Sequence, residues 1–333
     1  MSVSVNDRLV STAYAAGWTA VKALPMPLAA AGFRLGADIA LRRNGPRVRQ
    51  LRANLRPVVG DRLGADDLER LMRRALRSYA RYWLETFRLP AMDHADVAAR
   101  THVVGADRID AAVAAGRGAI LALPHMGNWD AGGVWLLNRG HPFTTVAERL
   151  RPEALFWRFV AYRERLGMHV LPLDPGAGSP VEALTAQLRA GGVVCLVADR
   201  ELSANGAPSS GVPSPGVPSS GVPSSGVPSS GVLVSFFGQA VRLPAGPALL
   251  AARTGAVLLP VIPWFEGRDW GLSVEPEIDV GGDGRLSERV ATATQQLADS
   301  WAAHLARRPE DWHMLQPFWL VDRVPAGAAD EPV

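Results

Sequence analysis

His125 and Asp130 are the residues of this chain whose types and spacing best suit chemistry. A hydroxyl is a poor nucleophile near neutral pH and needs a base while it attacks a carbonyl. An imidazole can take that proton on one nitrogen, while a carboxylate on the other nitrogen fixes the tautomer and steadies the imidazolium. Asp130 follows five positions after His125, close enough for a compact turn to join them. The pair predicts base-assisted acyl transfer, with simple turn and cap residues as the alternative.

The residues around the pair predict how it is positioned. Residues 120–123 form an uncharged run typical of a buried central strand, and Pro124 ends it because proline cannot donate to a sheet ladder. A turn follows, and Asn128 or Asp130 can cap the next helix. His125 is therefore expected at the carboxyl end of a strand, where open α/β sheets bind their ligands.

Strand and helix patterns alternate after this stretch. Strands are expected over 143–147, 169–173, 193–198, 232–237, 256–265 and 271–274, and helices over 152–166, 181–190, 246–253 and 286–306. An earlier amphipathic helix is expected over 66–87, ended by Pro90. The alternation predicts an α/β fold, with a single domain whose mixed, largely parallel central sheet is flanked by helices.

Charged residues follow two of these strands. Glu148 and Arg149 come after one, and Asp199, Arg200 and Glu201 after another. Because the carboxyl ends of parallel strands share one edge, these side chains could line a cleft with His125. Taken singly, each is more often a cap or an ion-pair partner.

Three stretches resemble one branch of the glycerolipid acyltransferase superfamily, that of the late lipid A and phosphatidylinositol mannoside acyltransferases. They are His-Met-Gly-Asn-Trp-Asp at 125–130, Val-Ala-Asp-Arg-Glu-Leu-Ser at 197–203, and Phe-Phe-Gly at 236–238 continued by Leu-Pro-Ala-Gly-Pro at 243–247. The motifs occur in matching order, and the resemblance covers most of the chain. Residues 309–319 also resemble the closing, C-terminal segment of proteins in this branch.

The resemblance implies a membrane-associated O-acyltransferase that moves a fatty acyl group to a glycolipid hydroxyl. Acyl-CoA (or acyl carrier protein) is the implied donor and co-substrate, and no metal or other cofactor is needed. His125 is the implied base and Asp130 its orienting partner. The implied substrate-binding residues are Asn128, Glu148, Arg149, Arg163, Asp199, Arg200, Glu201, Pro244 and Gly246. For Pro244 and Gly246, a plain turn before a core helix remains the alternative.

Composition and motifs favour one type of acceptor lipid and argue against several other classes of protein. Of 35 basic residues only Lys22 is lysine, and this Arg- and Ala-rich bias is typical of an actinobacterial chain, which favours a phosphatidylinositol mannoside acceptor. No Gly-x-Ser-x-Gly or P-loop occurs, and the basic segments lack a nucleic-acid-binding motif. The remaining alternatives are an inactive peripheral lipid-binding protein on the same fold, or an acyltransferase with another lipid acceptor.

The N-terminal quarter is expected to contact the membrane. Residues 1–90 carry sixteen Arg or Lys and seven Asp or Glu, a balance suited to anionic lipid. Neither apolar run in the first forty residues reaches the roughly 18–20 residues of a membrane-spanning helix. Pro25 and Pro27 divide the segment into two helices, either an anchor in the membrane interface or a pair packed on the protein's own core. The expected location is the cytoplasmic face of the cell membrane, held peripherally on its inner leaflet.

The domain organisation follows from these segments. Residues 1–60 are expected to form the membrane-contacting helices, 61–325 the acyltransferase domain and 326–333 a disordered tail. Within the domain, 206–230 repeats Gly-Val-Pro-Ser-Ser. Gly, Pro and Ser at this density cannot bury enough surface to offset chain entropy, which predicts a flexible loop produced by tandem duplication.

Overall fold

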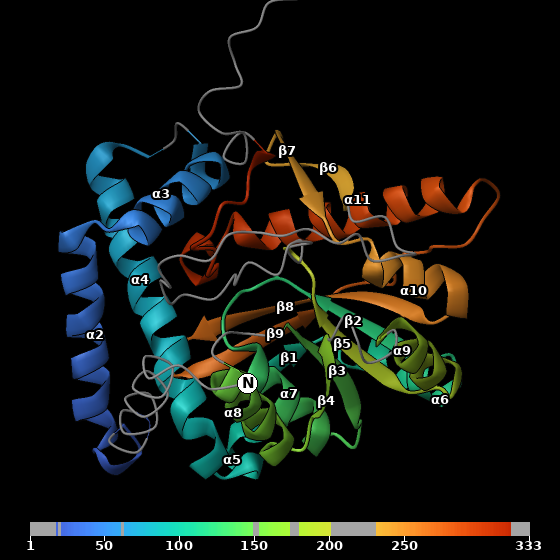
Figure 1. Ribbon diagram of the computed structural model, residues 1–333, viewed down its shortest axis with the longest axis horizontal. Coiled ribbons are helices and arrows are strands. Elements are labelled where there is room, and N and C mark those ends of the chain that lie inside the picture. Colours follow the sequence, from blue (N-terminus) through green and yellow to red (C-terminus); the bar gives the residue numbers. More distant parts are fainter. Residues whose placement is uncertain are drawn as a thin grey trace, which may run out of the picture.

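The computed structural model describes residues 18, 21–60, 63–148, 153–173, 180–200 and 231–320, and these contain a seven-stranded sheet in the order β1-β9-β8-β2-β5-β3-β4 (Figure 1). The strands are β1 Thr101–Val104, β2 Ala119–Leu123, β3 Phe143–Glu148, β4 His169–Leu173, β5 Val193–Val197, β8 Val257–Glu266 and β9 Asp269–Val274. All neighbours pair in parallel except β8 and β9. The predicted mixed, largely parallel sheet is confirmed.

Helices cover both faces of this sheet. One face packs against α5 His94–Ala99, α6 Asp107–Ala114, α7 Trp129–Asn138 and α8 Glu153–Arg165, and the other against α9 Pro180–Arg189, α10 Gly246–Thr254 and α11 Leu286–Leu305. Successive side chains of β2 point to opposite faces of the sheet and so contribute to both hydrophobic cores. Leu121 and Leu123 face the first set of helices, while Ile120 and Ala122 face the second. β2 is therefore buried on both sides, which explains its uninterrupted apolar run.

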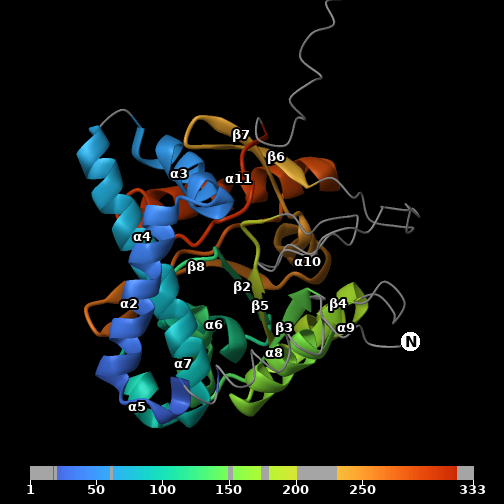
Figure 2. The same cartoon turned by 60° about the vertical axis from the view of Figure 1, so that its left-hand side comes forward.

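Three helices of the described part of the chain come before α5 and the sheet: α2 Met26–Arg43, α3 Pro46–Val59 and α4 Ala65–Arg88. In both views α2 runs beside α4 on the side away from the sheet (Figures 1 and 2). The predicted amphipathic helix over 66–87 is α4, and a 3-10 turn, Leu89–Ala91, follows it at the expected proline. The second of the two N-terminal helices predicted around Pro25 begins at Met26, whereas residues 1–17 lie outside the described residues.

A separate antiparallel hairpin lies between β5 and β8 in the chain. Its strands are β6 Val232–Phe236 and β7 Gln239–Leu243. The hairpin is held to α11 because Gln295 accepts from the Ser235 backbone N–H (2.8 Å) and donates to its carbonyl (2.9 Å). The sequence predicted β6 but not its partner, and likewise missed β1, α5 and α6. The repeat at 206–230 and the tail at 326–333 lie outside the described residues.

Candidate active site

The loop after β2 positions His125. Gly127 has a positive φ of 55°, and a Cβ there would lie 2.8 Å from the backbone of Pro263 and Trp264 in β8. Only glycine fits this close approach without strain. Asn128 then caps α7, its side-chain oxygen accepting from the Ala131 N–H at 3.2 Å. The predicted strand, turn and capped helix are confirmed, and His125 stands at the carboxyl end of β2.

Asp199 is the carboxylate that meets the imidazole. β5 runs beside β2, and Ala198 N–H donates to the Leu123 carbonyl at 2.8 Å, which brings the residue after Ala198 next to His125. One Asp199 oxygen contacts His125 Nδ1, and the other accepts from the His125 backbone N–H at 2.9 Å. Trp312 Nε1 donates to this second oxygen at 3.0 Å. The two residues are 74 positions apart in sequence.

The charge on Asp199 fixes the imidazole tautomer. Its burial alone would raise the carboxyl pKa, but the neighbouring His125 and the three donors outweigh burial and lower this pKa. An ionised carboxylate can only accept, so in the neutral imidazole of His125 the hydrogen is on Nδ1 and the lone pair is on Nε2. The His125 side chain is 34% exposed, which leaves it accessible to a substrate.

Asp130 does not meet the imidazole, contrary to the expectation from the sequence. Its carboxylate is fully buried and accepts from Arg163 Nε at 3.1 Å. Burial raises the Asp130 pKa, and Arg163 opposes that rise. Arg163 also lies over the Trp129 ring, 4.4 Å from its centroid. The first turn of α7 thus directs Asp130 into the interior toward α8, so the structure pairs Asp130 with Arg163 and His125 with Asp199.

Asn128 is fully engaged within the protein. Besides capping α7, it donates through Nδ2 to Glu85 Oε2 at 2.7 Å. Glu85 is buried in α4 and also accepts from Trp270 Nε1 at 2.7 Å and Arg81 Nε at 2.5 Å. This carboxylate ties the active-site loop to α4 and β9. Sequence reasoning missed Glu85 because an isolated acidic residue on a helix usually faces solvent.

The other candidate residues are more scattered. Arg200 donates to Gln316 at 2.8 Å, and Gly246 opens α10 with an exposed backbone directly after Pro244 and Ala245. Glu148 ends β3 at the same sheet edge as His125. Arg149 and Glu201 lie outside the described residues.

The C-terminal segment completes the site. After the 3-10 turn Pro309–Asp311, Trp312 forms an antiparallel bridge with Met126. His313 N–H donates to the His125 carbonyl at 2.8 Å, and Gly127 N–H donates to the Asp311 carbonyl at 2.9 Å. Asp311, Trp312 and His313 are consecutive in the sequence, and this run of polar and aromatic residues is the feature from which their role could have been predicted. No metal-ligand spacing involves them, so the sequence reading gave them no role.

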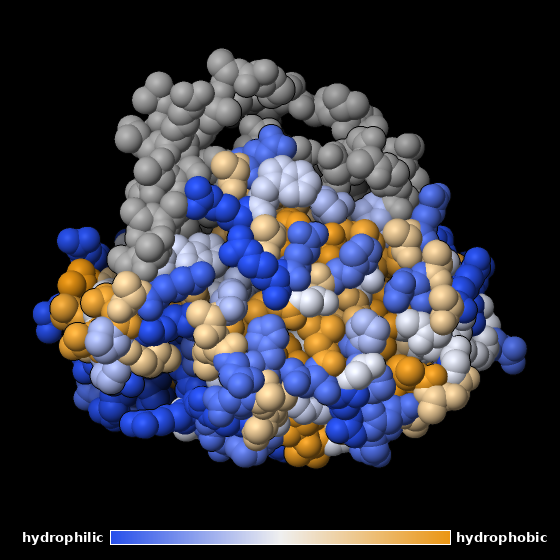
Figure 3. Space-filling model, turned by 90° about the horizontal axis from the view of Figure 1, so that it is seen from below, coloured by the Kyte–Doolittle hydropathy of each residue, from blue (hydrophilic) through white to orange (hydrophobic). Residues whose placement is uncertain are grey.

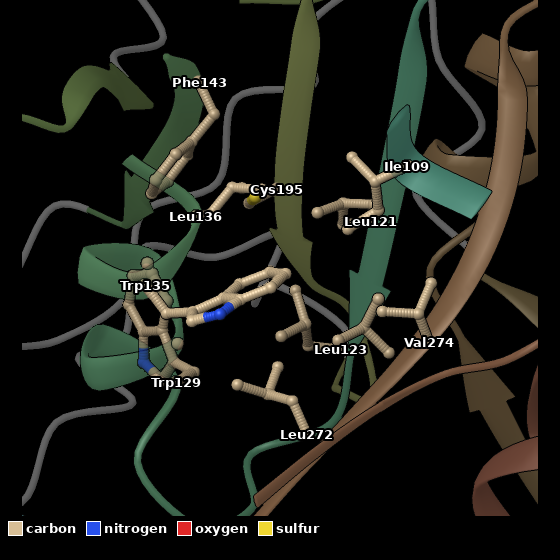
Figure 4. Close-up of a pocket in the computed structure, with 13 residues that line it drawn as sticks. Ile109, Leu121, Leu123, Trp129, Trp135, Leu136, Phe143, Cys195, Leu272 and Val274 are labelled. Atoms are coloured by element: carbon tan, nitrogen blue, oxygen red, sulfur yellow. The ribbon is translucent and has the colours of Figure 1, made fainter. Parts of the chain in front are cut away.

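An apolar pocket lies between α7 and the sheet (Figure 4). Its walls are aliphatic and aromatic side chains and two glycines, among them Leu121, Leu123, Trp129, Gly132, Gly133, Leu136, Phe143, Cys195 and Leu272. Trp129 directly follows Asn128 in the motif, so one wall of the pocket comes from the residue that follows the loop carrying His125. Cys195 is buried here, as its strand predicted.

The chain belongs to the bacterial lipid A biosynthesis acyltransferase family, whose sequence profile matches residues 2–212 and 223–321. It is an acyltransferase. It is 47% identical over 320 residues to a phosphatidylinositol mannoside acyltransferase of Mycolicibacterium smegmatis, covering 96% of this chain and 94% of the relative. It is 48% identical over 322 residues to a protein of the same name from Mycobacterium tuberculosis, covering 96% and 91%. The resemblance carried by the three motifs is confirmed.

Proposed function

We propose that this enzyme transfers a fatty acyl group from acyl-CoA to a sugar hydroxyl of a phosphatidylinositol mannoside. The names of the two mycobacterial relatives support the acceptor. The observation that carries the chemistry is the contact of His125 Nδ1 with ionised Asp199, because it leaves Nε2 of this partly exposed side chain to act as the base.

The reaction follows from this arrangement. His125 Nε2 takes the proton of the acceptor hydroxyl as its oxygen attacks the thioester carbonyl. The tetrahedral intermediate then collapses, the carbon–sulfur bond breaks, and the imidazolium returns the proton to the departing thiolate. Asp199 holds the ring and stabilises its positive charge throughout. No covalent acyl-enzyme intermediate and no cofactor is required.

Asp130 keeps a place in the site with a different role. By pairing with Arg163 it fixes a guanidinium above Trp129, one of the residues that line the apolar pocket. A guanidinium suits an anionic group of the donor or the acceptor. Glu148, Arg149, Arg200 and Glu201 are proposed to line the same cleft, with Pro244 and Gly246 facing the donor. Asn128 serves the substrate indirectly, by anchoring the loop to Glu85.

The apolar pocket is proposed to hold the acyl chain. Its lining offers almost no polar group, and burial of a methylene there gains about 0.8 kcal/mol. The two adjacent glycines of α7 let this helix pack closely on the side chains around the pocket. A Cβ on Gly133 would lie 2.6 Å from Met168 Cε and 3.0 Å from Phe143 Cζ.

The membrane is proposed to be met by α2. This helix buries Ala29 and Ala37 but leaves Leu28 61% and Leu35 60% exposed, with Ile39 on the same stripe. Apolar side chains gather over α2 at the left-hand edge of Figure 3. Exposed Arg34, Arg42 and Arg43 accompany the stripe and suit an anionic inner leaflet. Among the described residues no helix is long and apolar enough to cross a bilayer.

Purified enzyme, palmitoyl-CoA and a panel of glycolipid acceptors provide the test, with products identified by mass spectrometry. Acylated phosphatidylinositol mannoside that disappears in His125→Ala supports the proposal. Transfer to a different lipid alone would show that the acceptor is not a phosphatidylinositol mannoside. Lipid binding with no transfer to any acceptor would favour the non-catalytic alternative.

A further inference from the structure

His313 is the direct cross-strand neighbour of His125. The Met126–Trp312 bridge is antiparallel, and it is flanked by the hydrogen bonds from His313 N–H to His125 and from Gly127 N–H to Asp311. Residues 125 and 313 are thus opposite each other and project to the same side. Cβ atoms of such pairs are about 5 Å apart. The two imidazoles therefore start from neighbouring backbone positions on the same side of the bridge.

A relay of three side chains fixes the tautomer of His313. Asp311 accepts from the Phe265 backbone N–H at 3.0 Å and from the Ser78 hydroxyl at 2.7 Å. The Ser78 hydroxyl donates its hydrogen to Asp311. The Ser78 oxygen can therefore only accept from His313 Nε2, which is 3.0 Å away. His313 Nε2 therefore carries the ring hydrogen, and Nδ1 has a free lone pair.

That lone pair is available. His313 is half-buried, and Nδ1 makes no hydrogen bond with any residue that the structure describes. The ring is held in place by Tyr79, Tyr82 and Phe265, whose centroids lie 5.5, 5.7 and 6.3 Å away. Burial, then the neighbouring His125, lower the pKa of His313 to about 3, so the ring stays neutral and accepting at neutral pH.

We propose that His313 Nδ1 accepts a hydrogen bond from a second hydroxyl of the sugar whose first hydroxyl is deprotonated by His125. This inference rests on the proposed function and deepens it. Two neighbouring neutral acceptors match two O–H donors on one sugar ring. His313 thereby helps to bind and orient the acceptor sugar.

Two substitutions separate this role from simple packing. His313→Phe keeps the aromatic contacts and removes the acceptor, while His313→Asn places an amide oxygen close to the position of Nδ1. His102→Phe makes the same exchange at a histidine on β1 whose side chain is 62% exposed, and serves as the matched control. Synthetic phosphatidylinositol mannosides, each lacking one hydroxyl of the acylated sugar, supply the second half of a double-mutant cycle.

His313→Phe is expected to lower kcat/KM for the full acceptor about 3- to 10-fold, the range for one neutral hydrogen bond. Its rate of palmitoyl-CoA hydrolysis without acceptor should not fall. One deoxy acceptor should cost the wild-type enzyme a similar factor and His313→Phe nothing further, and His313→Asn should recover part of the loss. Equal penalties in wild type and His313→Phe for every deoxy acceptor would overturn the inference. Absence of transfer by the wild type to any mannoside would instead defeat the proposed function.

Discussion

The substitution Asp199→Asn tests how the charge of Asp199 controls the tautomer of His125. The Asp199 oxygen that accepts from both the His125 and the Trp312 N–H groups requires an acceptor, so the amide oxygen of asparagine will occupy that position. The amide NH₂ is then placed against His125 Nδ1. Since NH₂ donates, Nδ1 must become the acceptor and Nε2 must carry the hydrogen. The base is lost although the geometry is retained.

The expected loss in kcat for Asp199→Asn is about 10²–10⁴, the contribution usual for a general base, or roughly 2.7–5.5 kcal/mol in the barrier. Folding should change little because two of the three hydrogen bonds persist and the third only reverses its direction. Asp130→Asn is the matched comparison. It removes the charge that compensates the largely buried Arg163, so the free energy of unfolding should fall by about 3 kcal/mol. Its effect on kcat in the folded protein should be smaller than that of Asp199→Asn.

The assay combines release of CoA from palmitoyl-CoA, mass spectrometry of the acylated lipid and thermal melting of both variants. A folded Asp199→Asn enzyme with more than a tenth of wild-type kcat would refute the tautomer argument. A larger loss of kcat in Asp130→Asn at an unchanged melting temperature would restore Asp130 as the partner of the imidazole.

Three further predictions address the membrane face, the acyl pocket and the second histidine. Leu28→Glu combined with Leu35→Glu should weaken co-sedimentation with anionic liposomes while leaving the melting temperature unchanged, because both side chains are exposed; unaltered binding at every salt concentration would exclude α2 as the contact. Gly133→Val should narrow the pocket and shift donor preference from palmitoyl-CoA toward shorter acyl-CoAs, and an unchanged chain-length profile would place the acyl chain elsewhere. The folded pKa of His313, about 3, is below its unfolded value, so the unfolded chain binds the proton first and this contribution to stability is lost as pH falls from about 6.5 toward 3. By pH 5 the loss is at most about 2 kcal/mol, and urea unfolding at pH 7.5 and 5 should show it in wild type but not in His313→Phe.

Much of the fold could be predicted because its signals are local. The helix over 66–87 and the elements between 143 and 198 were each located to within a few residues, since hydrophobic periodicity and turn residues act within one segment. The short strand Thr101–Val104 and the helices on either side of it were missed. Each is four to eight residues long and gains its stability from packing rather than from its own pattern, since β1 pairs with β9, α5 packs on α7 and α6 packs on β2.

The sequence by itself determined the strand, glycine turn and capped helix that carry His125 to the sheet edge, because each step is fixed by residues next to one another. It also placed Asp199 at that edge. Only the tertiary structure decided that Asp199 meets His125 Nδ1, while Asp130 turns inward to Arg163. Strand order sets which residues become neighbours, and here it joined positions 74 residues apart. The C-terminal segment reached the site for the same reason, since a hydrogen bond between His313 and His125 depends on the folded path of the whole chain.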